Sequence, residues 1–147
     1  MNKYDWNRLN RQQLGKYAEY FTKMEFILYG LEVYTTEVDD RGIDYVIKKD
    51  GRYYDIQVKS IRFPITNYIY MKKKGFQLRE NLFLVLVLFR QWQEPELFLI
   101  PSKAWEKPND AFKDHNHYRE PEWGLNISNR TLKILDEYRF DKMISTL

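Results

Sequence analysis

The chain has 147 residues, a length typical of one domain, and its 44% hydrophobic and 31% charged residues exclude intrinsic disorder. It lacks cysteine, which excludes disulfide bonds, zinc–thiolate sites and thiol nucleophiles, and it lacks the run of about 18 apolar residues that a membrane span needs. From the length, the composition and the lack of an apolar run we expect one soluble, cytoplasmic domain, 1–147, that does not contact a membrane. The net charge of +3 mildly favours polyanion binding.

The first predicted element is an amphipathic helix. Asn10 can cap it, Gln13 completes a capping-box pattern, and Gly30 is a suitable end. Between them, apolar residues recur at helical spacing and predict the buried face. These residues are Leu14, Tyr17, Ala18, Phe21, Met24 and Leu28.

A three-strand meander should follow this helix. β-branched and aromatic residues predict the strands, with turns at 39–42 and 49–52. The third strand alternates, so that Asp55, Gln57 and Lys59 share one of its faces. The predicted strands cover residues 31–36, 43–48 and 53–61.

The second half of the chain predicts further strands. The uninterrupted apolar run 82–89 suits a central strand covered on both faces, and 96–100 should return beside it. Ser102 can cap a short helix that runs through Trp105.

The last predicted elements are a long polar loop over 108–121, a strand over 123–127 and a C-terminal helix with Leu132, Leu135 and Tyr138 inward. The order of all these elements predicts an α/β fold, an α+β arrangement of one mixed sheet flanked by helices.

Three polar side chains should meet on the meander. Asp44 opens the second strand, and Gln57 and Lys59 lie on the third, which pairs with it through the hairpin. Hard cations such as Mg²⁺ take oxygen ligands and need only one or two protein carboxylates beside substrate phosphate oxygens. The pattern therefore indicates a candidate metal-dependent site.

These residues also carry a family resemblance. Gly42-Ile43-Asp44, followed by Gln57-Val58-Lys59, resembles the signature of the PD-(D/E)XK nuclease superfamily, nearest to small archaeal Holliday-junction resolvases. Glu19 stands where those relatives carry a glutamate on the first helix. The resemblance implies a restriction-endonuclease-like core and a homodimeric, Mg²⁺- or Mn²⁺-dependent endonuclease acting on DNA, including branched or otherwise structured DNA.

The resemblance also implies a role for each residue. Asp44, Gln57 and the backbone carbonyl of Val58 would hold the metal, Glu19 would complete its surroundings, and Lys59 would orient or activate the attacking water. Glu19 can also be read as an ordinary solvated acid, because it lies off the predicted apolar stripe.

Two positions depart from the family pattern. Ile43 replaces the proline that names the motif, and Gln57 replaces an acid, which weakens the attraction for a cation unless Asp55 compensates. A second hypothesis is therefore a nuclease fold kept as a nucleic-acid-binding or partner-binding module. A third is that the resemblance is accidental and the chain is a protein-interaction domain.

A basic segment could contact the nucleic acid. Lys72, Lys73 and Lys74, with Arg62 nearby and Tyr68 and Tyr70 interleaved, could grip phosphates and stack bases, although a charge run is more often a solvated loop. The segment 115–117, His-Asn-His, is typical of a polar loop rather than of a metal site.

Overall fold

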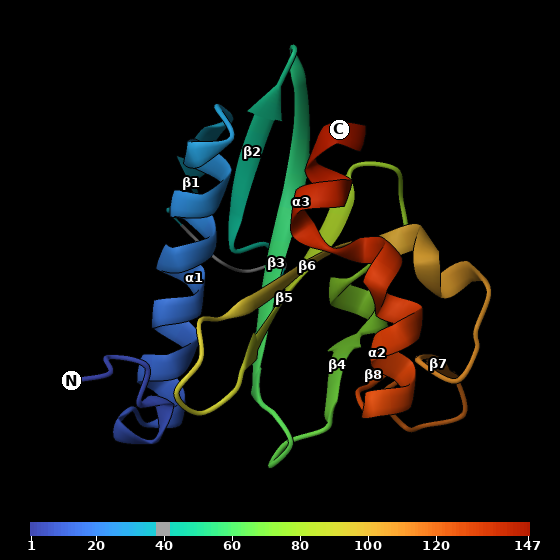
Figure 1. The fold of residues 1–147 in the computed structure, drawn as a ribbon. Coiled ribbons are helices and arrows are strands. Elements are labelled where there is room, and N and C mark those ends of the chain that lie inside the picture. The colour runs from blue at the N-terminus through green and yellow to red at the C-terminus, as the bar shows by residue number, and fades with distance from the viewer. Residues whose placement is uncertain (38–41) are drawn as a thin grey trace.

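The protein has a mixed five-stranded sheet, a smaller three-stranded sheet and helices at both ends of the chain (Figure 1). The computed structural model describes residues 1–37 and 42–147, so most of the turn predicted over 39–42 lies outside the described residues. The predicted α+β class, with an N-terminal helix, a mixed sheet and C-terminal helices, is confirmed.

The first helix, α1 (Arg11–Leu28), has the predicted capping box. The Asn10 side chain accepts from the Gln13 amide at 2.8 Å, and the Gln13 side chain accepts from the Asn10 amide at 2.9 Å. Gly30 follows the helix at φ +85°, which glycine adopts without strain. The boundaries of this helix therefore follow from local sequence.

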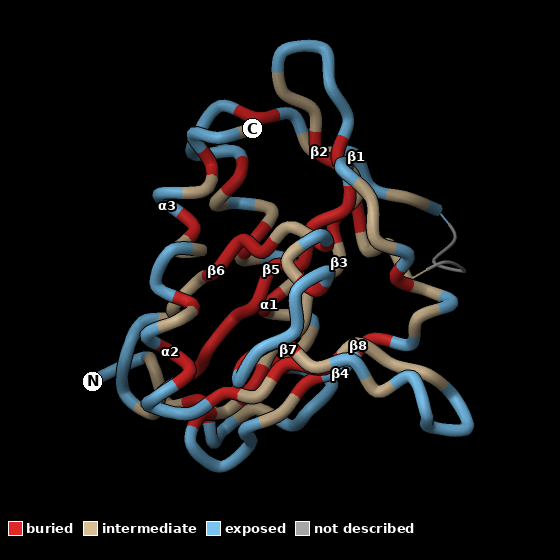
Figure 2. Tube along the Cα trace, turned by 90° about the vertical axis from the view of Figure 1, so that its right-hand side faces the viewer, coloured by how far each residue is buried: buried red, intermediate tan, exposed pale blue. Residues whose placement is uncertain are grey.

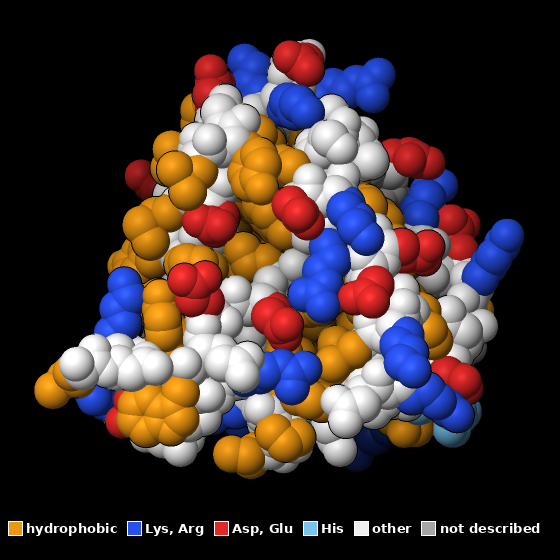
Figure 3. Space-filling model, in the orientation of Figure 1, with side chains coloured by type: hydrophobic (Ala, Val, Ile, Leu, Met, Phe, Trp, Pro, Cys, Tyr) orange, Lys and Arg blue, Asp and Glu red, His pale blue; other side chains and the backbone are white. Residues whose placement is uncertain are grey.

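The buried face of α1 differs in part from the prediction. Leu14 and Ala18 are buried as expected, but the face continues through Thr22 and Phe26. Met24 and Leu28 are 53% and 77% exposed, so their inward placement was wrong. Thr22 can be buried because its hydroxyl donates to the Glu19 carbonyl and accepts from Tyr45. Apolar side chains consequently gather on the outside of α1 (Figure 3).

The predicted meander is present in the five-stranded sheet, whose order is β1-β2-β3-β5-β6. Its hairpin turns at Asp50 and Gly51, both at positive φ, as the two-residue turn requires. The meander strands are β1 (Glu32–Thr35), β2 (Tyr45–Lys49) and β3 (Arg52–Arg62).

The centre of the large sheet is the predicted apolar strand. β5 (Leu82–Phe89) is buried at every residue and runs parallel to β3, while β6 (Glu96–Pro101) returns antiparallel beside it. α1 and the short helix α3 (Phe140–Met143) cover one face of the sheet, and the smaller sheet covers the other. Buried residues therefore concentrate along these strands (Figure 2).

The smaller sheet was not expected from the sequence. Its order is β4 (Tyr68–Lys72), β8 (Glu122–Asn126) and β7 (Phe112–His115). β7 lies inside the segment predicted as a polar loop, and it forms because Ala111 and Phe112 are buried in the core between the sheets. The sequence therefore predicted the larger, mixed sheet but not the second sheet.

The C-terminal part is broken into short helices. α2 (Asn129–Leu135) is capped by Ser128 and buries Leu132 and Leu135 as predicted. Ser102 does not cap its helix: its hydroxyl exchanges hydrogen bonds with the backbone of Arg79. The 3-10 helices cover Trp6–Arg8, Lys73–Gly75, Ser102–Glu106, Asp136–Tyr138 and Ile144–Thr146. No helix within 1–37 and 42–147 is long and apolar enough to cross a membrane.

Candidate active site

A cleft of about 860 Å³ opens between the two sheets and the start of α1. Its lining comprises residues 57–62 of β3, all five residues of β4, the first turns of α1, and Gly42 and Gly75. Gln57 and Lys59 thus share this cleft with Tyr68, Tyr70 and Lys72 of β4, a strand of the other sheet.

The lining of this cleft is basic. None of the described residues that line it is acidic, although the whole chain carries a net charge of only +3. A concave surface with one sign of charge concentrates ions of the opposite sign, so the cleft favours a polyanion. The basic residues that line it are Arg11, Lys59, Arg62, Lys72 and Lys74.

Asp44, which directly precedes β2, is fixed against the cleft-lining part of β3 but is not itself part of the lining. Its backbone amide donates to the Ile56 carbonyl at 2.8 Å, and its Oδ2 atom accepts from the Val58 amide at 2.6 Å. Tyr45 pairs with Ile56 in the antiparallel register of β2 and β3. The next pair in that register would be Asp44 with Gln57. The carboxylate therefore lies beside the segment that contributes Gln57 and Lys59.

Gln57 has an unusual polar environment. Its Oε1 atom is buried and has no hydrogen-bond partner within residues 1–37 and 42–147. An orphaned buried oxygen costs free energy unless an ion, water or ligand satisfies it. Gly42, at φ +73°, lies close by: a Cβ there would be 3.7 Å from Oε1 and 2.9 Å from the Gly75 carbonyl oxygen. Glycine thus allows this loop to approach the amide closely.

The amine of Lys59 lies among charged groups. Burial lowers its pKa below the ordinary lysine value, the Asp44 carboxylate opposes this shift, and the Arg11 guanidinium adds to it. A lowered pKa leaves a larger fraction of the amine neutral near physiological pH. Such an amine can accept a proton or hold a water, which an ordinary surface lysine does poorly.

Glu19 lies on the cleft-facing side of α1, one turn beyond the lining residue Gly15, but is not itself part of the lining. Its carboxylate lies 3.6 Å from both Lys16 and Lys23. Burial raises the pKa of Tyr45, the hydrogen bond to Thr22 opposes the rise, and the charges of Asp44 and Glu19 add to it. Glu19 is therefore next to the buried face, which runs through Ala18 and Thr22.

Asp55 does not take part in this group. Its carboxylate forms an ion pair with Arg79 at 2.6 Å, and Arg79 is tied to Ser102 through its backbone. Compensation for Gln57 by Asp55 is thus not supported by the geometry.

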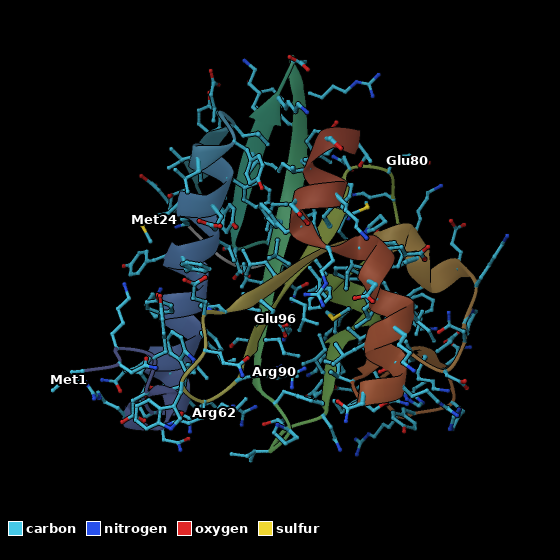
Figure 4. The ribbon with its side chains drawn as sticks, viewed as in Figure 1. Met1, Met24, Arg62, Glu80, Arg90 and Glu96 are labelled. Atoms are coloured by element: carbon cyan, nitrogen blue, oxygen red, sulfur yellow. The ribbon has the colours of Figure 1, made fainter. Side chains whose placement is uncertain are left out.

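The predicted nucleic-acid contacts divide into two sets. Lys72 and Lys74 line the cleft, as does Arg62, whose guanidinium donates to the Leu9 carbonyl at the lower end of the molecule (Figure 4). The Lys72 amine is paired with Glu120 at 2.6 Å, so a bound phosphate would replace that carboxylate. Lys73 does not line the cleft: its amine pairs with Asp114 and lies 3.9 Å from the centre of the Trp123 ring. Sequence reasoning missed Arg11, because nothing in the helix pattern marks its first residue.

Comparison with known proteins shows the fold. No protein-family model matches the chain, and no curated protein sequence matches it. Among solved structures, the bacterial homing endonuclease I-Ssp6803I is similar with a TM-score of 0.57 and 16% identity. The match covers 92% of this chain and 91% of that one. The chain therefore has the fold of a homing endonuclease over nearly its whole length.

Proposed function

We propose that this protein is a metal-dependent endonuclease of the PD-(D/E)XK kind that hydrolyses phosphodiester bonds in DNA, branched or structured DNA included. The observation that carries the proposal is the meeting of Asp44, Gln57 and Lys59 on the paired strands β2 and β3, beside a basic cleft. The fold shared with a homing endonuclease supports it.

The donor atoms suit a hard cation. The Oε1 of Gln57, which has no hydrogen-bond partner among the described residues, is a carbonyl oxygen, the type of ligand that Mg²⁺ and Mn²⁺ accept. Asp44 brings a carboxylate to the same part of β3. These two residues and the Val58 carbonyl would hold the ion, with Glu19 nearby. When bound, the ion would supply positive charge for the phosphate and increase the acidity of a water.

The other groups of the cleft would handle the substrate. Lys59, with its lowered pKa, accepts a proton from the attacking water or holds it in line with the phosphorus. Arg11, Arg62, Lys72 and Lys74 bind the phosphates of the strand and neutralise charge that develops during hydrolysis.

A cleavage assay tests this proposal. Purified protein is incubated with linear and branched DNA, with and without Mn²⁺, beside Asp44→Ala and Lys59→Ala. We expect Mn²⁺-dependent cleavage that each substitution reduces by at least about 100-fold while circular dichroism shows an intact fold. Asp110→Ala and Lys107→Ala, both at exposed positions, should cleave normally. Full cleavage by the two site variants would refute the proposal.

We also propose that the active form is a homodimer, because the nucleases that the sequence resembles cut two strands with two sites. Analytical ultracentrifugation of the protein with DNA tests this. A protein that stays monomeric on DNA and still cuts both strands at one position would contradict it.

A second candidate function is a nucleic-acid-binding or partner-binding module on the same fold. It is favoured by one observation: among the described residues, no group of three or more His, Cys, Asp or Glu side chains is placed to hold a metal. This candidate predicts salt-sensitive DNA binding without metal, and no cleavage even by Gln57→Glu. Cleavage gained by Gln57→Glu would reject it.

A further inference from the structure

The smaller sheet has one face in the core and one face turned outward. Ile69 and Met71 of β4 are buried, and the alternate residues Tyr68, Tyr70 and Lys72 lie on the opposite face. The strand register places Gly124 opposite Tyr70, and His115 opposite Glu122, on this same outward face. Aromatic side chains therefore share with Lys72 and Glu122 a surface that the core does not use.

Four rings on this side of the sheet form a continuous series. Tyr70 and Tyr68 have ring centres 6.3 Å apart at an interplanar angle of 21°, and Tyr68 lies 6.1 Å from His115. His115 in turn stacks on Tyr118 at 4.5 Å and 3°. We call these residues the aromatic row. Its two ends are open to solvent, with Tyr70 47% and Tyr118 44% exposed.

The position of Tyr68 is fixed by its neighbours on β8. A Cβ on Gly124 would lie 2.3 Å from the Tyr68 hydroxyl and 2.7 Å from its ring, so this ring lies directly across the glycine. The Tyr68 hydroxyl donates to Glu122 at 2.5 Å. The middle of the aromatic row is thus held rigidly, which lowers the entropy cost of stacking a ligand on it.

The aromatic row is continuous with the basic cleft. Tyr68 and Tyr70 line the cleft together with Lys72, Lys74 and Lys59. A strand whose phosphates lie among these cations would therefore pass directly over the rings. Bases can stack on aromatic side chains only where they are unpaired, because in a duplex their faces already stack on one another.

We propose that the aromatic row stacks the bases of unpaired nucleotides in a DNA strand whose phosphates occupy the basic cleft. This inference rests on the proposed function for its choice of DNA. It specifies the substrate class as DNA with a single-stranded segment beside the cleaved bond, such as a flap, gap or branch.

Binding without metal tests this inference separately from catalysis. Fluorescence anisotropy in EDTA compares a labelled oligonucleotide of roughly 16 nucleotides with the same strand in a duplex. We expect Tyr70→Ala and Tyr118→Ala each to weaken single-strand binding by about 5-fold to 100-fold and to leave duplex binding nearly unchanged. Tyr70→Phe, which keeps the ring, and Tyr34→Ala, an exposed tyrosine on β1, should bind as the unchanged protein does.

Abasic oligonucleotides, which lack bases at chosen positions, test whether the aromatic row binds the bases of the strand. A strand with abasic sites keeps its phosphates and should bind the unchanged protein more weakly. This difference between the strands should shrink in Tyr70→Ala and shrink further in the double variant Tyr70→Ala/Tyr118→Ala. Equal losses on duplex and single strand, or an abasic effect that stays undiminished in the double variant, would overturn the inference. Single-strand binding without any metal-dependent cleavage would refute the proposed function alone.

Discussion

Lys59 is the residue whose surroundings bear most directly on chemistry. Burial and the Arg11 charge lower its pKa, while Asp44 keeps part of the charge stabilised. If its neutral amine is the active form, the cleavage rate should rise with pH through this lowered pKa and level off above it. The rising part of the pH profile then lies below the pH at which a solvated lysine loses its proton.

Arg11→Gln should move that rise to higher pH, because removing a neighbouring positive charge makes the protonated amine easier to keep. The shift can be followed in the pH–rate profile and, independently of activity, by NMR of the Lys59 side chain. Arg8→Gln, at an exposed arginine outside the cleft, should leave both unchanged. If the pKa of Lys59 in Arg11→Gln equalled that in the unchanged protein, the Arg11 charge would not be a cause of the lowered pKa.

At the scale of elements, the site depends on how the loop before β2 approaches the 3-10 turn at Gly75. Gly42 has φ +73°, and a Cβ there would lie 2.9 Å from the Gly75 carbonyl oxygen. A side chain at this position would be strained by its backbone and would also push the two segments apart. Gly15, in the interior of α1, has nothing within 4 Å of such a Cβ.

The two glycines therefore predict opposite effects of the same substitution. Gly42→Ala should lower the free energy of unfolding by about 1–3 kcal/mol. Gly15→Ala should raise it by about 0.5–1 kcal/mol, because alanine is the better helix former. Urea denaturation followed by circular dichroism measures both. A Gly42→Ala protein as stable as the original would show that the loop does not need this close approach.

The elements also show what the sequence could and could not predict. The capping box, the hairpin at Asp50 and the apolar strand β5 follow from local patterns, and they were predicted close to their observed bounds. β4 and β7 were missed because a lysine run and a polar segment hide their short buried faces. The pairing of β4 with β8 connects residues about 55 positions apart, which no local pattern specifies.

The candidate site divides in the same way. Adjacent hairpin strands allowed the sequence to predict where Asp44, Gln57 and Lys59 would lie. The basic cleft could not be predicted, because β4 and the start of α1 complete it only after folding. The ion pair that occupies Asp55 is likewise a tertiary contact. The roles of these residues stay predictions until cleavage is measured.

At the scale of the molecule, the charge distribution predicts how DNA binding depends on salt. Each lysine that contacts a phosphate releases counterions, so the logarithm of affinity falls linearly with the logarithm of salt concentration. Lys72→Ala and Lys74→Ala should each reduce that slope by about 1. Lys73→Ala should not, because Lys73 does not line the cleft. Equal slopes for all three variants would show that DNA binds elsewhere.

The central claim is that the β2–β3 pair holds a hard cation, and calorimetric titration with Mn²⁺ measures this directly. We expect one Mn²⁺ per chain for the unchanged protein, none for Asp44→Ala, and binding at least roughly 5-fold tighter for Gln57→Glu, which adds a negative charge at the orphaned oxygen. Absence of Mn²⁺ binding to both the unchanged protein and Gln57→Glu, with their folds intact, would contradict the account.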